Sequence, residues 1–323
     1  MRGIIKDPKN GDVIIGVVNA LRHFTPFLGM SFSNDDSLRL ITPEGAVSRL
    51  TSFPFPNGMV YNPADGMLYV ATGAIHCHQS LGGYEINGKC PGTNGIVEVD
   101  PATGDHHDFA GGVAGYGEGT GTQAKFAGVG GITLDPDNGD FYVADTANMR
   151  IRMVTAAGVV TTVAGSGTEG SSDGSGTAAQ FAWPHAIAYC AKDKSLYVAD
   201  TDNDEIRKVT ADGVVTTIAG TPQAGYADGS GASARFDHPA GIACATDGTL
   251  YIADTRNNTI REMDATGAVT TLAGSQQEGT VNGVGSAARF SRPTDVWYDA
   301  SDGSLYVVDQ GSNNVRKVTT ATH

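Results

Sequence analysis

The run Leu196-Tyr197-Val198-Ala199-Asp200 recurs along the chain at an almost constant spacing. Similar runs begin at Phe141, Leu250 and Leu305, and the tyrosines of successive copies lie 54 or 55 residues apart. Two weaker copies occupy 68–72 and 13–17. Self-similarity at a fixed period is the signature of a repeat architecture. Six units of about 55 residues therefore account for the 323 residues of the chain.

Each unit contains four short apolar runs separated by turn sequences rich in Gly, Asp and Asn. The clearest unit has these runs at 240–244, 250–254, 259–263 and 268–273. Four short antiparallel strands, repeated six times, predict an all-β fold: a six-bladed β-propeller with four-stranded blades. Radial packing buries both faces of a blade, which explains why the strands are apolar on more than one face.

The last four units resemble a known repeat most closely. The third unit from the end begins its second run with Leu-Tyr-Val-Ala-Asp-Thr at 196–201, followed by Asn203. Its third run reads Ile-Arg-Lys-Val at 206–209, and its fourth reads Val-Thr-Thr-x-Ala-Gly at 215–220. The linker to the next unit reads Phe-x-x-Pro-x-Gly-Ile at 236–242. These motifs are similar to the NHL repeat. The resemblance implies one six-bladed propeller domain over residues 1–323, with blades starting near residues 3, 58, 131, 186, 241 and 295.

The charge balance argues against two classes of partner. The chain carries 21 Lys and Arg against 35 Asp and Glu, a formal net charge of −14. Nucleic-acid binding depends on a basic surface, so neither nucleic acid nor an anionic membrane is expected as a partner.

No apolar run reaches the ~18 residues of a membrane-spanning helix. The N-terminal residues also lack the features of a signal peptide.

Comparison of the six units separates scaffold residues from site residues. An Asp ends the second strand of four units and an Arg lies on the third strand of five, which indicates one structural ion pair per blade. The start of the first strand, by contrast, differs in every unit. In an antiparallel blade this end shares one face with the two expanded loops, at 18–33 and 73–94. We therefore expect a binding face there. The candidate binding residues are Asn57, His76, His78, Tyr84, Trp183, His185, Thr294 and Asp295.

The four cysteines fall into two pairs. Cys77 and Cys90 bracket one expanded loop, and we expect a disulfide, which would place the protein in an extracellular, cell-surface or secretory compartment. A zinc site with the adjacent histidines, or free thiols, are the alternatives. Cys190 and Cys244 lie on neighbouring first strands, one register step apart. Because side chains on opposite faces of a pleat should not meet, we expect two buried free thiols there.

The axial channel is the place where an enzyme of this fold class would hold a metal. Members of the resembling family include zinc lyases with a His after Pro in three blades, and related six-bladed lactonases hold an axial calcium. Here His185 alone follows the first pattern, since the matching positions are Asn57, Ala240 and Thr294. Asn57 and Asp295 offer few of the six to eight oxygens that calcium prefers. No cofactor is expected, and calcium in the channel is the alternative.

The final unit ends with a third strand near 314–318. The last blade should therefore have three strands, and the sequence leaves open whether the chain is part of a larger protein. An unpaired strand is a liability that an additional strand could cover.

These observations predict a non-enzymatic binding or scaffold propeller. It would engage a protein, peptide or glycan partner on the face that bears the loops between strands two and three and between blades. The alternative is a hydrolase or lyase of the six-bladed lactonase or amidating-lyase type, which would use calcium or zinc in the axial channel.

Overall fold

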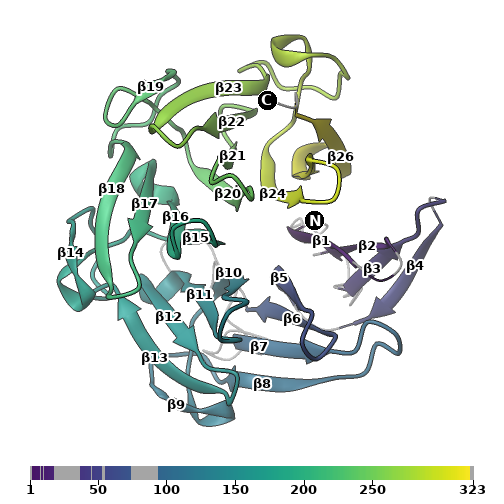
Figure 1. The fold of residues 1–323 in the computed structure, drawn as a ribbon, viewed down its shortest axis with the longest axis vertical. Coiled ribbons are helices and arrows are strands. Elements are labelled where there is room, and N and C mark those ends of the chain that lie inside the picture. The colour runs from purple at the N-terminus through teal and green to yellow at the C-terminus, as the bar shows by residue number, and fades with distance from the viewer. Residues whose placement is uncertain are drawn as a thin grey trace, which may run out of the picture.

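The computed structural model describes residues 2–7, 9, 11–17, 37–44, 46–52, 55–73 and 94–320. Six sheets surround a central axis, and the chain passes from one sheet to the next around a ring (Figure 1). The fold is therefore a six-bladed β-propeller, as the repeat predicts. Among the described residues, no helix has the length and apolar character needed to cross a membrane.

The first three blades each contain four antiparallel strands in chain order from the axis outward. Blade one consists of β1 (Arg2–Lys6), β2 (Val13–Val17), β3 (Ser37–Ile41) and β4 (Val47–Thr51). Blade two consists of β5 (Pro56–Asn62), β6 (Met67–Thr72), β7 (Asn94–Val99) and β8 (His106–Gly112). Blade three consists of β10 (Val129–Leu134), β11 (Phe141–Asp145), β12 (Arg150–Val154) and β13 (Val159–Ala164).

Blades four and five repeat this order, and blade six stops after its third strand, as predicted. Blade four consists of β15 (Pro184–Cys190), β16 (Ser195–Asp200), β17 (Glu205–Val209) and β18 (Val214–Gly220). Blade five consists of β20 (Pro239–Cys244), β21 (Leu250–Asp254), β22 (Thr259–Met263) and β23 (Ala268–Gly274). Blade six consists of β24 (Pro293–Asp299), β25 (Ser304–Asp309) and β26 (Asn314–Thr319).

The linkers before blades three, four and five add a two-residue strand to the outer edge of the blade they enter. These strands are β9 (Gly119–Thr120) on β13, β14 (Gly174–Ser175) on β18 and β19 (Gly229–Ser230) on β23. Covering an edge strand in this way limits unwanted pairing with other chains. The sequence analysis did not anticipate these edge strands.

Six single-turn 3₁₀ helices complete the described elements. Three precede the innermost strands: η2 (Gly121–Gln123), η4 (Gly176–Ala178) and η6 (Gly285–Ala287). Three follow the second strands: η3 (Thr146–Asn148), η5 (Thr201–Asn203) and η7 (Gln310–Ser312).

The core lies between blades. Phe126, Phe181, Phe236 and Phe290 are each at most 1% exposed and belong to four separate clusters formed by neighbouring blades. The innermost strands contact one another around the ring, and β1 closes it against β24. At this closure, Lys6 Nζ lies 2.7 Å from Asp299 Oδ2.

The repeated Asp and Arg form buried ion pairs in blades three to five. The distance from Arg Nη1 to Asp Oδ2 is 2.7 or 2.8 Å, and both side chains are fully buried. The pairs are Arg152–Asp145, Arg207–Asp200 and Arg261–Asp254. Burial raises the pKa of each Asp to about 6 despite the adjacent guanidinium. These residues therefore serve the scaffold, as expected from their repetition.

The prediction of free thiols at Cys190 and Cys244 is wrong, because the structure joins these residues in a disulfide with Cα atoms 5.5 Å apart. The error lay in treating β15 and β20 as strands of one sheet. They belong to different blades. One face of β15 therefore packs against a face of β20, and side chains from the two strands meet between the two sheets. Ala188 of β15 and Ile242 of β20 already pack in one cluster with Cys244. Cys190, two residues beyond Ala188, points the same way.

Candidate binding site at the channel mouth

One backbone position repeats just before the innermost strand of blades two to six, but its side chain changes. It has a φ between 51° and 59°, the left-handed region. The residues at this position are Phe55, Gly128, Trp183, His238 and Arg292. For residues other than glycine this conformation costs roughly 1–2 kcal/mol, and such strain concentrates at functional sites. The scaffold thus holds four large side chains in an unfavourable conformation at one end of the channel.

Side chains of the preceding blade fix this position. Asp204 Oδ1 accepts the backbone N–H of His238 at 2.7 Å, and Asn258 Oδ1 accepts that of Arg292 at 2.8 Å. Asn94 does the same for Gly128 at 3.0 Å. These bonds use only the backbone N–H of the variable residue, so they leave its side chain free to vary from blade to blade.

A second set of bonds anchors the residue that follows the variable position. The hydroxyls of Thr146, Thr201 and Thr255 donate to the carbonyl oxygens of Pro184, Pro239 and Pro293, over 2.7–2.8 Å. Each bond joins the end of a second strand to the start of the next blade's innermost strand. The mouth is therefore a rigid frame that presents side chains which differ between blades.

Three of the variable side chains, those of Trp183, His238 and Arg292, line a cavity of about 340 Å³. Five of the candidate residues from the sequence line it: Asn57, Trp183, His185, Thr294 and Asp295. The remaining candidates, His76, His78 and Tyr84, lie outside the described residues, as do Cys77 and Cys90. The structure thus brings together every sequence candidate that it describes.

The same cavity has lining residues that the sequence analysis missed. They are Asp202, His238, Arg256, Arg292 and Gln310. His238 and Arg292 occupy the position of Trp183 in their own blades, directly before a proline. A comparison of the residues before these prolines would have found both.

Asn57 and His185 each bridge two blades. The amide of Asn57 donates to the carbonyl oxygens of Gly73 at 2.9 Å and Val129 at 2.8 Å, in blades two and three. The Nδ1 atom of His185 lies 2.9 Å from the carbonyl oxygen of Ala240 in blade five. Because a carbonyl only accepts, Nδ1 carries the proton of this contact. Both residues help to hold the frame of the mouth.

Asp295 lies deeper in the channel. It lines both the mouth cavity and a second cavity of about 190 Å³, whose walls are mainly apolar residues of the innermost strands. Backbone N–H groups of Val296 and Ile4 donate to its carboxyl and stabilise the charged form. Burial has the larger effect and raises its pKa to about 7. This carboxyl is therefore partly protonated at neutral pH.

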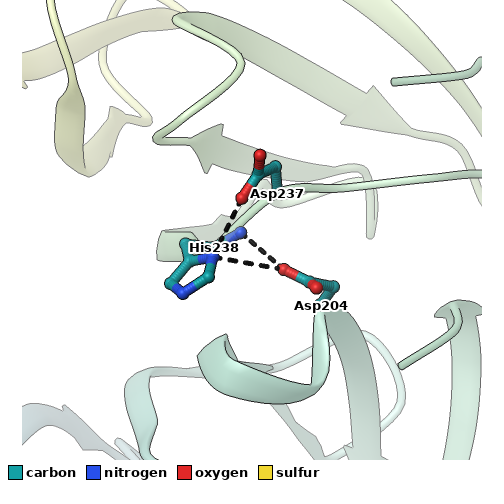
Figure 2. Close-up of side chains that lie close together, drawn as sticks. All are labelled: Asp204, Asp237 and His238. Atoms are coloured by element: carbon teal, nitrogen blue, oxygen red, sulfur yellow. Dashed lines mark hydrogen bonds and ion pairs between the residues drawn. The ribbon is translucent and has the colours of Figure 1, made fainter. Parts of the chain in front are cut away.

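His238 is held at the rim by carboxylates from two loops (Figure 2). Its Nδ1 lies 2.9 Å from Asp237 Oδ1 and 3.5 Å from Asp204 Oδ1, and its Nε2 lies 3.6 Å from Asp202 Oδ1. Arg256 extends the network toward Asp237 at 3.7 Å. This arrangement orients the imidazole and makes one side of the mouth rich in hydrogen-bond acceptors.

Among the described residues, one group of three His, Cys, Asp or Glu side chains has its ligand atoms close enough to share a metal ion. This group consists of Asp204, Asp237 and His238. Two of these oxygens already accept hydrogen bonds, from the backbone N–H and from Nδ1 of His238. In the described part of the channel, His185 and Asp295 do not form such a group. The described residues therefore place no group of three such zinc ligands at the axis.

Comparison with known proteins gives matches over most of the chain. A family model described as the Teneurin NHL domain matches residues 34–224 and 223–321. Protein SUPPRESSOR OF QUENCHING 1, chloroplastic, of Arabidopsis thaliana is 27% identical over 279 residues, 83% of this chain and 25% of that protein. Teneurin-3 of Danio rerio is 29% identical over 229 residues, 62% of this chain and 8% of that protein. The chain thus spans a quarter or less of these relatives.

Solved structures share the fold. An auxiliary nutrient binding protein from Bacteroides thetaiotaomicron superimposes with a TM-score of 0.70 at 16% identity, over 98% of this chain and 68% of that one. The virginiamycin B lyase of Staphylococcus aureus gives 0.53 at 15% identity, over 100% of this chain and 85% of that one. At these identities the likeness extends to the fold and not to the activity.

Proposed function

We propose that this chain, which belongs to the Teneurin NHL domain family, is a non-enzymatic binding propeller. Its channel mouth engages a protein, peptide or glycan partner. One observation carries the proposal: a single repeated backbone position holds a different residue in each of five blades, and three of these residues, Trp183, His238 and Arg292, line one cavity. A purely structural position would repeat its residue, as the buried Asp and Arg do.

The chemistry of the mouth suits recognition of a protruding group. Trp183 offers an aromatic surface, Arg256 and Arg292 offer guanidinium groups, and the carboxylates around His238 offer acceptors. Trp and Arg are the residue types that most often dominate binding energy at protein interfaces. A cavity of about 340 Å³ admits one or two side chains or a single sugar ring. A partner that inserts such a group would find apolar, cationic and anionic contacts within one site.

We also propose that the protein works in an oxidising compartment, outside the cell or in the secretory lumen. The Cys190–Cys244 disulfide supports this proposal, because disulfides persist mainly in such environments.

A screen against defined ligands tests the binding function. A peptide-display library and a glycan array would be probed with the wild-type protein, with a Trp183→Ala, Arg292→Ala double variant, and with Thr246→Ala. Thr246 is exposed in the turn at the opposite end of blade five and serves as the matched control. We expect ligands that the wild type and Thr246→Ala retain and the double variant loses. Undiminished binding by the double variant would place the site elsewhere.

The enzymatic alternative rests on Asp295, because a carboxyl with a pKa of about 7 suits general acid–base catalysis near neutral pH. Its test is a panel of ester, lactone and amide substrates with the wild type and Asp295→Asn. A turnover whose pH profile bends near 7, and which Asp295→Asn abolishes, would favour the enzyme over the binding module.

A further inference from the structure

The junctions between neighbouring blades each bring two variable side chains to the channel mouth. The first follows the threonine at the end of a second strand, and the second precedes the proline that begins the next innermost strand. In blades three to five the threonine hydroxyl donates to the carbonyl oxygen of that proline over 2.7 or 2.8 Å. The two positions therefore have the same relation at successive junctions, and their chemistry can be compared from one junction to the next.

The junction of blades four and five pairs acids with a histidine. Asp202 and His238 occupy the two variable positions, and Asp202 Oδ1 lies 3.6 Å from His238 Nε2. The other ring nitrogen, Nδ1, lies 2.9 Å from Asp237 Oδ1. Each imidazole nitrogen thus faces a carboxylate oxygen, and the polar side chains of this junction satisfy one another.

The next junction carries two like charges instead. Arg256 and Arg292 occupy the same two positions between blades five and six, and both line the mouth cavity. Their backbones match those of Asp202 and His238. The N–H groups of Asp202 and Arg256 each donate over 3.1 Å to the residue two places before the proline of their own blade, and the φ angles of His238 and Arg292 are 51° and 53°. The frame therefore holds two guanidinium groups at positions where the preceding junction holds an acid and a histidine.

Neither guanidinium is hydrogen-bonded to an acid among the described residues. Arg256 Nη1 is 3.7 Å from Asp237 Oδ1, and this oxygen already contacts His238 Nδ1 at 2.9 Å. The bond at Arg292 uses its backbone N–H, which donates to Asn258 Oδ1, and its exposed side chain pairs with no residue that the structure describes. Two like charges at adjacent positions repel each other, so this junction favours an anion from outside the chain.

The surroundings of the two arginines select the kind of anion. A guanidinium is planar, and its N–H groups can bond both oxygens of a carboxylate. Carboxyl groups of Asp202 and Asp295 line the same cavity, Asp237 borders Arg256, and the whole chain has a net charge of −14. These charges disfavour a dianion such as phosphate. A carboxylate, with one charge and a planar shape, suits this site best.

The neutral groups of the mouth favour a peptide over an acidic sugar. Sugar hydroxyls require several side chains with free hydrogen-bonding groups. Most neutral donors of the mouth already hold the frame, since Asn57 donates to two backbone carbonyls and His185 to a third, and the threonine hydroxyls donate to the prolines. Trp183 lines the same cavity and offers an apolar surface to the aliphatic carbons of an amino acid.

We propose that the channel mouth binds the carboxylate of a glutamate or aspartate side chain of a peptide partner, through Arg256 and Arg292. This inference rests on the proposed binding function and names the group that enters the mouth. The two guanidinium groups supply charge-assisted hydrogen bonds, and the carboxylate supplies the negative charge that the junction of blades five and six lacks.

Blocked tripeptides test this proposal. The probe is acetyl-Gly-Glu-Gly-amide, and NMR follows the side-chain Nε–Hε signals of the arginines as it is added to the full chain. We expect saturable shifts of the signals of Arg256 and Arg292, assigned through the Gln variants. The matching Gln peptide should bind at least fivefold more weakly, and the matching Lys peptide should not bind. The Gln peptide with a free terminal carboxylate, glucuronate and inorganic phosphate are the other probes, and each should bind more weakly than the Glu peptide.

Three arginine variants locate the site. Arg256→Gln and Arg292→Gln should each weaken binding of the Glu peptide at least fivefold. Arg289→Gln is the matched control, because Arg289 is exposed and does not line the cavity, and it should bind normally. Arg256→Asp places a carboxylate beside Arg292, as Asp202 lies beside His238. It should bind no Glu peptide and should have a higher Tm than Arg256→Gln, which shows that the loss of binding is not a loss of folding.

Failure of this inference differs from failure of the proposed function. Equal binding of the Glu and Gln peptides, or undiminished binding by Arg256→Gln, would overturn the carboxylate site. Tighter binding of the Lys peptide would assign the mouth to a cation, and tighter binding of glucuronate or phosphate would assign it to those anions. Display peptides that require Trp183 but contain no enriched acidic residue would leave the binding function standing and overturn this inference alone. A display screen and glycan array without any ligand would count against both.

Discussion

At the scale of single residues, the mouth shows how the propeller varies its surface without changing its frame. The backbone N–H at this position donates to the preceding blade in blades three, five and six, so the side chain can differ: Phe55, Gly128, Trp183, His238 and Arg292 all occur there. Each keeps a left-handed backbone that glycine would adopt at no steric cost, as Gly128 does. If the side chains bind a partner, the strain is retained for function.

Arg292 offers the cleanest measure of this strain. Its side chain is exposed, so few contacts are lost on substitution. We expect Arg292→Gly to raise the free energy of unfolding by about 1 kcal/mol, because glycine relieves the left-handed strain. Arg292→Ala keeps the strain and should leave stability unchanged. Urea unfolding of both variants measures the difference, and equal stability of the two would show that this position is unstrained.

The buried arginines should be far less tolerant of change. Arg207→Ala leaves the carboxylate of Asp200 buried without its cation, and we expect a loss of about 3–5 kcal/mol. Arg316→Ala is the matched control in blade six, where the ion pair is longer and the arginine side chain is 12% exposed; its loss should be smaller. Because burial raises the pKa of Asp200, protonation should reduce the deficit of Arg207→Ala at pH 5. Chemical denaturation at pH 5 and 7.5 tests both statements.

Asp295 should make stability depend on pH in the opposite sense to an ion-paired Asp. Its pKa is about 7 in the folded state and about 4 when unfolded, so the native state holds the extra proton between these values. Stability therefore falls as pH rises from 4 to 7. Asp295→Asn should match the wild type near pH 4 and exceed it above pH 7, by up to about 4 kcal/mol. A constant difference between the two proteins across this range would contradict the shift.

The sequence predicted part of this site, and the limits are physical. His185, Thr294 and Asp295 could be placed because the start of an innermost strand has to line the axis. His238 and Arg292 could be found by comparing the residues before these prolines, but their left-handed backbone could not be predicted, because a residue before proline normally has extended backbone. Only hydrogen bonds from the preceding blade, such as that of Asp204, hold these residues in the left-handed region. Such a contact, 34 residues distant in the chain, leaves no local pattern.

At the scale of elements, the strands were predictable and the contacts between blades were not. The repeat fixed the order and number of strands in the described blades, including the three-stranded last blade. The two-residue edge strands were missed, because Gly119–Thr120 or Gly174–Ser175 read as turns and pair only with a strand about 40 residues later. The cysteine error has the same origin: pleat alternation describes a single sheet, and two adjacent blades are two sheets.

Peptide mapping tests the corrected cysteine pairing. Digestion of the oxidised protein without reducing agent should yield one linked pair of peptides containing Cys190 and Cys244, which separates on reduction. Replacing both residues by alanine should lower the free energy of unfolding by about 2–4 kcal/mol under oxidising conditions. In reducing buffer the variant and the wild type should differ much less. Recovery of both peptides with free thiols from the oxidised protein would restore the original prediction.

At the scale of the whole molecule, the ring is closed without a shared sheet. Among the described strands, blade one contains β1 to β4 and blade six contains β24 to β26, and none of them is shared between the two sheets. Closure depends on packing between β1 and β24 and on the ion pair between Lys6 and Asp299. Asp299 is 5% exposed in this pair, so its charge is poorly solvated without the lysine. The pair should therefore contribute to the stability of the entire ring.

Lys6→Ala tests this closure. The Lys6 ammonium lowers the pKa of Asp299, so the contribution of the pair is present above pH ~4 and is lost as pH falls through the lowered value. The carboxylate in turn raises the pKa of Lys6, so the contribution is fully present below pH 10.5 and is lost at higher pH. We expect Lys6→Ala to lose about 1–3 kcal/mol at pH 7 and to approach the wild type in acid. Lys194→Ala, which removes an exposed pair between blades three and four, should change stability little at any pH. A pH-independent deficit in Lys6→Ala would mean that its aliphatic chain, and not its charge, holds the first blade to the last.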